Sequence, residues 1–195
     1  AQWVFTKGVN VDEFVVDNKM PSATGKGYIS YISNCDPALD VNNKIARANT
    51  AGEPYITGGW PGDWWLFTIP EMTIKAGTVI NAKFHARASG TGMKYWMLEY
   101  YDGGEWKPGA PLQTTTVGEG DQAQTFSYNY EMMNTDHCLI DRNMTFEHAI
   151  NNGDILIRLR CMANWQASGK GALAAPNGGT HRISVQNNIN PTISI

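Results

Sequence analysis

The sequence has few charged residues and no long apolar run, and each absence excludes a class of function. Asp, Glu, Lys and Arg make up 17% of the 195 residues, below the roughly 25% of a typical globular protein. The net charge is −3 and no block of Lys and Arg occurs, whereas binding to nucleic-acid phosphates needs clustered cations. No apolar stretch approaches the roughly 20 residues that span a bilayer. We therefore expect no nucleic-acid partner and no membrane span.

Motifs of the common enzyme classes are also missing. The sequence contains no GxSxG elbow, no HExxH pair, no phosphate-binding loop and no dinucleotide fingerprint. The four histidines are scattered without an i, i+4 pair, so a zinc site is not expected. Glycoside hydrolysis needs only two carboxylates at a set separation. By residue type alone, its candidates are Asp63, Glu99, Glu131 and Glu147, all of which are read more simply as turn or surface residues.

Only three cysteines are present: Cys35, Cys138 and Cys161. They permit at most one internal disulfide and leave one thiol over. Cys161 alternates with Ile157 and Leu159, which predicts that it points into the core as a small apolar residue.

Calcium is the one inorganic ligand that the loop composition suggests, because calcium binds carboxylate, amide and carbonyl oxygens. Asp36, Asp40, Asn42 and Asn43 in one loop, or Glu119 and Asp121 in another, supply such atoms. Neither set has the spacing of an EF-hand. A structural calcium ion is thus left open, and no other cofactor is expected.

Glycine, asparagine, threonine and aromatic residues take the place of the missing charges. This composition suits short strands joined by many turns and argues against a helical bundle. Strand-like runs recur along the chain, each bounded by turn residues. The clearest are Gly27–Ile32, Trp64–Ile69, Thr78–Ala88, Lys94–Tyr101, Gln124–Tyr130, Asp154–Met162 and His181–Val185.

Alternation of apolar and polar residues is clearest in Thr78–Ala88 and Asp154–Met162. One apolar and one polar face per strand is typical of antiparallel sandwich sheets. We predict an all-β antiparallel sandwich that forms a single domain over residues 1–195, with at most one short helix, at Asn143–Asn151. Because the chain opens on a strand-like segment without a basic and apolar leader, we expect a removed leader or a start inside a longer polypeptide.

The aromatic residues are the best pointers to function. The chain has seven tryptophans, three of them within residues 58–65. Sugar rings stack their C–H faces on flat aromatic rings, while Asp, Asn and Arg side chains bind the hydroxyl groups. Trp60, in a Gly/Pro loop beside Asp63, has the right composition for this, and loops carry binding residues disproportionately. By contrast, alternation places Trp65 in the core, and Trp96 lies mid-strand as a packing residue.

Two further tryptophans and a row of arginines extend the candidate site. Trp106 follows a hairpin-like turn, and Trp165 opens a long Gly-rich and Ala-rich loop, a kind of segment that is often functional. Arg87, Arg158 and Arg160 occupy polar strand faces. They either line a groove or, as is more frequent, pair with carboxylates such as Glu99 across neighbouring strands.

Three segments resemble a known family: Gly62–Pro70, Lys75–Thr78 and Gly90–Tyr100. They look like secreted jelly-roll domains of Bacteroidetes, which are similar to the galactose-binding-domain-like superfamily. The resemblance covers the chain from about Phe14 to Val185. It implies a jelly-roll fold, a secreted, periplasmic or outer-membrane location, and an association with polysaccharide use in a chain with neighbouring domains. No binding residue is carried over from the family.

We therefore predict a non-catalytic carbohydrate-binding module whose partner is a polysaccharide or oligosaccharide. Its expected ligand-binding residues are Trp60, Asp63, Arg87, Trp106, Arg160 and Trp165. One alternative is a structural or adhesive domain, in which the exposed aromatic residues form an apolar patch for a protein partner. Another is a glycan hydrolase with two carboxylates in a cleft.

Overall fold

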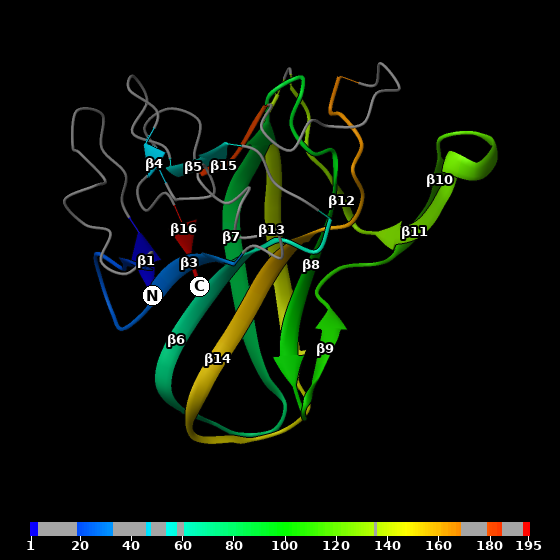
Figure 1. Cartoon of the computed structure of the whole chain (residues 1–195). Coiled ribbons are helices and arrows are strands. Elements are labelled where there is room, and N and C mark those ends of the chain that lie inside the picture. The colour runs from blue at the N-terminus through cyan, green and yellow to red at the C-terminus, as the bar shows by residue number, and fades with distance from the viewer. Residues whose placement is uncertain are drawn as a thin grey trace.

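The chain folds as an antiparallel β-sandwich of the jelly-roll type (Figure 1). The computed structural model describes residues 1–3, 19–32, 46–47, 54–57, 61–134, 136–168, 179–184 and 193–195. Within these residues, two sheets and a separate hairpin account for all strands, and the one helical element is the 3₁₀ turn Gly120–Gln122. In this described part, no helix is long and apolar enough to cross a membrane. The predicted all-β sandwich is confirmed.

Sheet A forms one layer of the sandwich. Its central strand β7 pairs with β13 along one edge and with β15 and β16 along the other. The members of sheet A are β1 (Gln2–Trp3), β16 (Ile193–Ser194), β7 (Thr78–Ala88), β13 (Cys138–Phe146), β15 (Thr180–Ser184), β5 (Pro54–Thr57) and β4 (Ala46–Arg47).

Sheet B forms the other layer. Its long strand β14 lies between β6 and β8. The members of sheet B are β12 (Tyr130–Glu131), β9 (Glu105–Pro108), β8 (Tyr95–Asp102), β14 (Ile150–Cys161), β6 (Trp64–Ile74), β3 (Tyr28–Ile32) and β2 (Lys19–Pro21). A separate hairpin of β10 (Gln113–Val117) and β11 (Gln124–Tyr128) projects from the side of the sandwich (Figure 1).

The chain crosses between the sheets at two tight connections. One joins β6 of sheet B to β7 of sheet A, and the other joins β13 of sheet A to β14 of sheet B. Both lie at the lower end of the sandwich in Figure 1. These crossings align the two sheets, so the apolar faces of β6 and β14 meet those of β7 and β13.

Aromatic side chains from both sheets fill the core. The rings of Phe67 in sheet B and Phe84 in sheet A are 4.9 Å apart between centroids, and those of Tyr100 and Phe146 are 5.1 Å apart. Cys161 is buried in the same core, and burial raises the pKa of its thiol. The alternation predicted along β7 and β14 is confirmed.

The expected strands were found, and the stretch that could have held a short helical turn, Asn143–Asn151, is not helical. The run Gln124–Tyr130 is divided between β11 and β12, with Asn129 between them, and Val185 lies outside the described residues. Asn143–Asn151 forms the end of β13 and the start of β14. Arg142 interrupts the apolar alternation of β13. It lies opposite the buried Ala82 and so has the inward parity, yet its side chain is exposed.

Candidate functional site on the outer face of sheet B

The outer face of sheet B is the face that points away from sheet A. Because successive side chains of a strand point to opposite faces, the buried residues identify the outward ones. In β8, Leu98 is fully buried in the core, so Glu99 points outward. In β14, Leu159 is fully buried, so Arg158 and Arg160 point outward.

The strand register brings these three charged groups together. Arg158 lies directly opposite Glu99, and Arg160 lies two residues further along the same face. Nε of Arg158 donates to Oε2 of Glu99 at 2.7 Å. Arg160 donates from Nε to Oε2 at 2.9 Å and from Nη2 to Oε1 at 3.0 Å. The predicted pairing of these arginines with Glu99 is confirmed, through three charge-assisted hydrogen bonds.

The environment of Glu99 keeps its carboxyl group ionised. Burial alone would raise its pKa, because desolvation disfavours the charged form. Hydrogen bonds from Arg160 and then Arg158 outweigh burial and hold the pKa of Glu99 below its usual value. A carboxylate in this state is suited to orienting the two guanidinium groups and poorly suited to donating a proton as a general acid.

Two tryptophans flank Arg158. Its guanidinium carbon lies 3.9 Å from the ring centroid of Trp106 and 5.1 Å from that of Trp64. The ring of Tyr101 contacts Trp106 with a centroid separation of 5.3 Å. Cation–π contacts of this kind contribute about 0.5–1 kcal/mol when exposed and more when desolvated. We call the set Trp64, Glu99, Tyr101, Trp106, Arg158 and Arg160 the Trp–Arg platform.

The β8–β9 hairpin positions Trp106. Its two central residues, Gly103 and Gly104, have φ of 63° and 94°, and two residues with positive φ are typical of the tightest hairpin turns. The turn sets Trp106 directly opposite Tyr101 on β8. Since both side chains lie on the outer face, the hairpin extends the Trp–Arg platform past the edge of β8.

A second aromatic group adjoins the other end of the outer face. Tyr95 points outward from the start of β8 and contacts Phe126 and Tyr128 of the projecting hairpin, with ring centroids 5.2 and 4.8 Å apart. Trp165 packs partly buried against the same group. The six residue steps from Tyr95 to Tyr101 correspond to about 20 Å of strand, so aromatic rings lie at both ends of an extended face.

Three of the six residues expected to bind ligand lie on or beside this face. Trp106 and Arg160 belong to the Trp–Arg platform, and Trp165 belongs to the aromatic group at the far end. Trp60 lies outside the described residues.

Arg87, which was also expected to bind ligand, does not lie on the outer face of sheet B. Arg87 lies on β7, where it points outward from sheet A and donates from Nη2 to the carbonyl oxygen of Asn134 at 2.7 Å. Strand alternation had placed it on a polar face correctly. It lies on the opposite layer from Arg160, because the two strands belong to different sheets.

Asp63, another residue that was expected to bind ligand, does not reach the outer face of sheet B either. Asp63 is completely buried at the start of β6, and its Oδ2 accepts a hydrogen bond from the hydroxyl of Tyr31 at 3.0 Å. Asp63 has the same alternation parity as Trp65, which was correctly expected in the core. This shared parity could have placed Asp63 in the core from the sequence alone. The same parity indicates that Trp64 points outward. Neither Trp64 nor Tyr101 was among the residues predicted to bind ligand.

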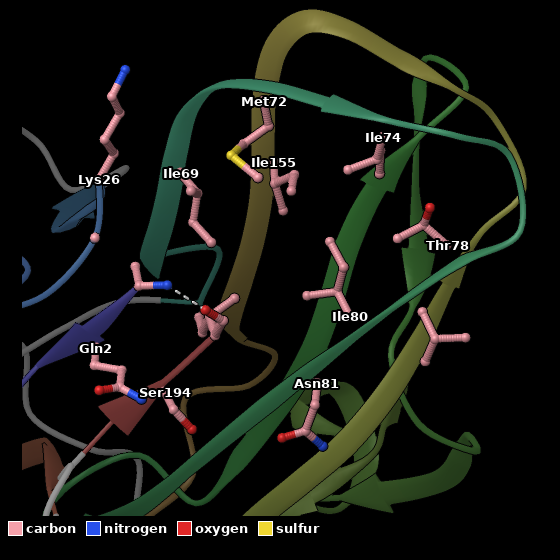
Figure 2. A pocket seen from close by; sticks show the side chains of 14 residues that line it. Gln2, Lys26, Ile69, Met72, Ile74, Thr78, Ile80, Asn81, Ile155 and Ser194 are labelled. Atoms are coloured by element: carbon pink, nitrogen blue, oxygen red, sulfur yellow. Dashed lines mark hydrogen bonds between the residues drawn. The ribbon is translucent and has the colours of Figure 1, made fainter.

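An apolar cleft of about 690 Å³ lies between the sheets, near β1 and β16. Figure 2 shows Ile69, Met72, Ile74, Ile80 and Ile155 around it. The one titratable side chain that lines it, that of Lys26, is ion-paired with Glu71. The polar groups that also line it include the side chains of Gln2, Asn81 and Ser194, and the N-terminal ammonium group of Ala1, which donates to the carbonyl oxygen of Ile195.

Within the described part of the chain, no cluster of side chains supports metal or thiol chemistry. There, no group of three or more His, Cys, Asp or Glu side chains is arranged to hold a metal ion. Glu119 and Asp121 are described, at and beside the 3₁₀ turn, whereas the loop with Asp36 and Asp40 lies outside the described residues. Cys138 and Cys161 are free thiols, and Cys35 also lies outside.

The four carboxylates considered for hydrolysis have separate partners. Glu99 binds two arginines, Asp63 lies in the core, Glu131 is paired with Lys94 at 2.9 Å, and Glu147 is paired with Lys107 at 2.7 Å.

Comparisons with known proteins do not assign a family. No family model matches the chain, and no curated protein matches its sequence. The chain is similar to a solved structure titled "CBM4 structure and function", with a TM-score of 0.46 and 11% sequence identity over 94% of this chain and 97% of that one. A likeness at this level does not identify a ligand, so a function has to rest on the side chains of this chain.

Proposed function

We propose that this protein is a non-catalytic module that binds carbohydrate chains along the outer face of sheet B. The observation that carries the proposal is the position of Arg158 between Trp64 and Trp106, with Glu99 fixing its Nε and that of Arg160. Such an arrangement presents ring surfaces next to fixed hydrogen-bond donors. These are the two kinds of group that a sugar needs, one for its C–H face and one for its hydroxyl groups.

Preorganisation supports binding at this place. The Arg158 side chain is 11% exposed and that of Glu99 is 6% exposed, so ring stacking and hydrogen bonds hold both before any ligand arrives. Groups that are already ordered lose little conformational entropy on binding.

Affinity electrophoresis through gels containing soluble plant and host polysaccharides tests the proposal. We expect at least one polysaccharide to retard the unaltered protein. Trp106→Ala should weaken that binding about tenfold or more, which corresponds to a loss of about 1.4 kcal/mol. Leu139→Ala is the matched control, because Leu139 is a 49% exposed apolar residue on the outer face of sheet A.

Two results would contradict the proposal. One is a protein that no polysaccharide retards, and the other is retardation that Trp106→Ala leaves unchanged while the variant remains folded by circular dichroism. Concentration-dependent association in sedimentation without any effect of sugar would instead favour the adhesive alternative. Release of reducing ends that disappears in Glu99→Gln would favour the hydrolase.

A further inference from the structure

The Trp–Arg platform has an excess of positive charge in a protein that is negative overall. It contains two guanidinium groups and one carboxylate, whereas the whole chain has a net charge of −3. The next ion pair along this face, Lys94 with Glu131, is balanced and leaves the excess unchanged. An uncompensated charge that is largely withdrawn from water costs free energy, so an anion at this place would be stabilising.

The donors that Glu99 leaves unused could bind such an anion. Among the described residues, Arg158 hydrogen-bonds only through Nε, and Arg160 only through Nε and Nη2. Neither Nη atom of Arg158 is among the fully enclosed polar atoms that lack a partner, so each keeps some exposure although the side chain as a whole is 11% exposed. A guanidinium edge matches the geometry of a carboxylate or an oxyanion through parallel N–H groups.

The flanking rings limit what else this edge can bind. Trp64 comes from β6 and Trp106 from β9, two strands on opposite sides of β14. Both rings lie close to the guanidinium carbon of Arg158, so a ligand that reaches this group lies beside at least one of them. A ligand that places an anionic group there brings the rest of its body against Trp106 and Tyr101. That body must therefore be flat or ring-shaped with an apolar face, which a pyranose ring provides.

We infer that the preferred ligand is an acidic glycan, with its anionic substituent at the Nη edge of Arg158 and a sugar ring against Trp106. This inference rests on the proposed function and specifies its ligand class. The substituent is either the carboxylate of a uronic acid or a sulfate ester, since both offer paired oxygen atoms to the guanidinium group.

Isothermal titration with oligogalacturonate, its methyl ester, a sulfated oligosaccharide and a neutral cello-oligosaccharide tests the inference on the unaltered protein. We expect at least one of the two acidic ligands to bind about tenfold or more tightly than both neutral ones. The tighter acidic ligand identifies the source of the charge. The advantage should shrink between about 20 mM and about 300 mM salt, because screening weakens exposed charge pairs.

Variants localise the effect. Arg158→Gln and Arg160→Gln each remove one positive charge from the Trp–Arg platform and should abolish most of the preference for the acidic ligand. Lys83→Gln is the matched control, because it makes the same charge change on the outer face of sheet A, where Lys83 pairs with Asp141 at 3.1 Å. The ligand comparison and the salt series need no variant, so they decide the question even where a substitution prevents folding.

Each outcome has a distinct meaning. Equal affinity for acidic and neutral ligands overturns the acid preference and leaves the proposed function intact. Binding to none of the ligands overturns the preference, and it counts against carbohydrate binding if the polysaccharide gels also show no retardation. A preference for the acidic ligand that persists in both arginine variants would place the anion elsewhere and would also overturn the inference.

Discussion

The indole N–H of Trp65 donates to Nδ1 of His181 across the interior of the sandwich, at 3.1 Å. An indole nitrogen can only donate, so Nδ1 must be the accepting nitrogen and the ring proton of neutral His181 is on Nε2. That atom lies 3.4 Å from the hydroxyl of Tyr31, which donates to Asp63. A chain of polar groups thus connects sheet A to sheet B, and all of its members are buried.

The first prediction concerns this chain of polar groups. His181→Phe leaves the Trp65 indole N–H without its acceptor, which should lower the free energy of unfolding by about 1–3 kcal/mol. The double variant His181→Phe/Trp65→Phe removes donor and acceptor together. We expect it to lose less stability than the sum of the two single variants. Denaturant unfolding of the four proteins measures this, and strict additivity would contradict the assigned hydrogen bond.

The second prediction concerns Asp102, which fastens the β13–β14 turn to the β8–β9 hairpin. Its carboxylate accepts from the backbone N–H groups of Glu147 and His148 at 3.0 and 3.1 Å, and from Lys107 at 3.1 Å. Burial alone would raise the pKa of Asp102, but these hydrogen bonds, that of Lys107 first, outweigh it and lower the pKa. The ionised form is therefore favoured in the folded state.

A lowered pKa makes this contribution sensitive to acid in a defined direction. The stabilisation is fully present above the ordinary Asp pKa of about 4 and is lost as the pH falls through the lower pKa of the folded state. Asp102→Asn should cost about 1–3 kcal/mol at neutral pH. The difference between variant and unaltered protein should narrow in acid, as measured by urea unfolding between neutral pH and about pH 3. A constant difference would show that ionisation of Asp102 does not matter.

Alternation within single strands explains how much of this fold could be predicted. The side-chain period of two fixes which residues of a strand share a face, and this was enough to place Trp65 and Cys161 in the core. The same rule failed for β13, where the inward-parity residue Arg142 is exposed and lies 6.0 Å from the ring of Tyr130. On an edge strand, a long side chain can reach solvent from a position that alternation assigns to the core.

The candidate site depended on information that a single strand does not contain. Alternation gives the face of a strand and not the sheet to which the strand belongs. Arg87 and Arg160 both occupy polar faces, yet they point away from opposite layers. The contact of Arg158 with Trp64 and Trp106 also joins side chains from three strands. The order and register of those strands decide it, and both are properties of the folded chain.

The third prediction concerns the backbone at Glu71, where φ is 56°. A residue with a side chain is strained at positive φ, whereas glycine is not. Glu71→Gly and Glu71→Ala both remove the exposed ion pair with Lys26, so they differ mainly in backbone preference. We expect the glycine variant to melt about 2–4 °C higher than the alanine variant.

The order of the two variants should reverse at an ordinary strand position. Val79 is exposed on β7 and does not have a positive φ. There, glycine costs about 0.5–1 kcal/mol relative to alanine, so Val79→Gly should melt below Val79→Ala. Calorimetry on the four variants decides. If alanine is the more stable residue at both positions, the conformation assigned to Glu71 is wrong.

The last prediction concerns Asn129, whose side chain takes the place of a partner strand at the edge of β8. Its Oδ1 accepts from the backbone N–H of Leu98 at 2.7 Å, and its Nδ2 donates to the carbonyl oxygen of Leu98 at 3.0 Å. β12 pairs with β8 on one side of this point and β9 on the other. Asn129 therefore continues the ladder next to Glu99, together with the backbone N–H of Gly109, which also donates to the carbonyl oxygen of Leu98 at 2.8 Å.

Asn129→Asp keeps the shape and replaces the donor with a carboxylate oxygen that faces the Leu98 carbonyl. We expect a loss of about 1–3 kcal/mol at neutral pH. Burial should raise the pKa of the introduced carboxyl group, and its protonated form can again donate to Leu98. Relative to the unaltered protein, this variant should regain stability as the pH falls. The deficit of Asp102→Asn also narrows in acid, but there the unaltered protein loses stability, whereas here the variant itself gains it. Asn129→Ala, which cannot titrate, is the control in the same urea series. The loss of unfolding free energy in Asn129→Asp should shrink in acid, while that in Asn129→Ala stays constant. If both losses stay constant, the donor to Leu98 contributes little to this edge.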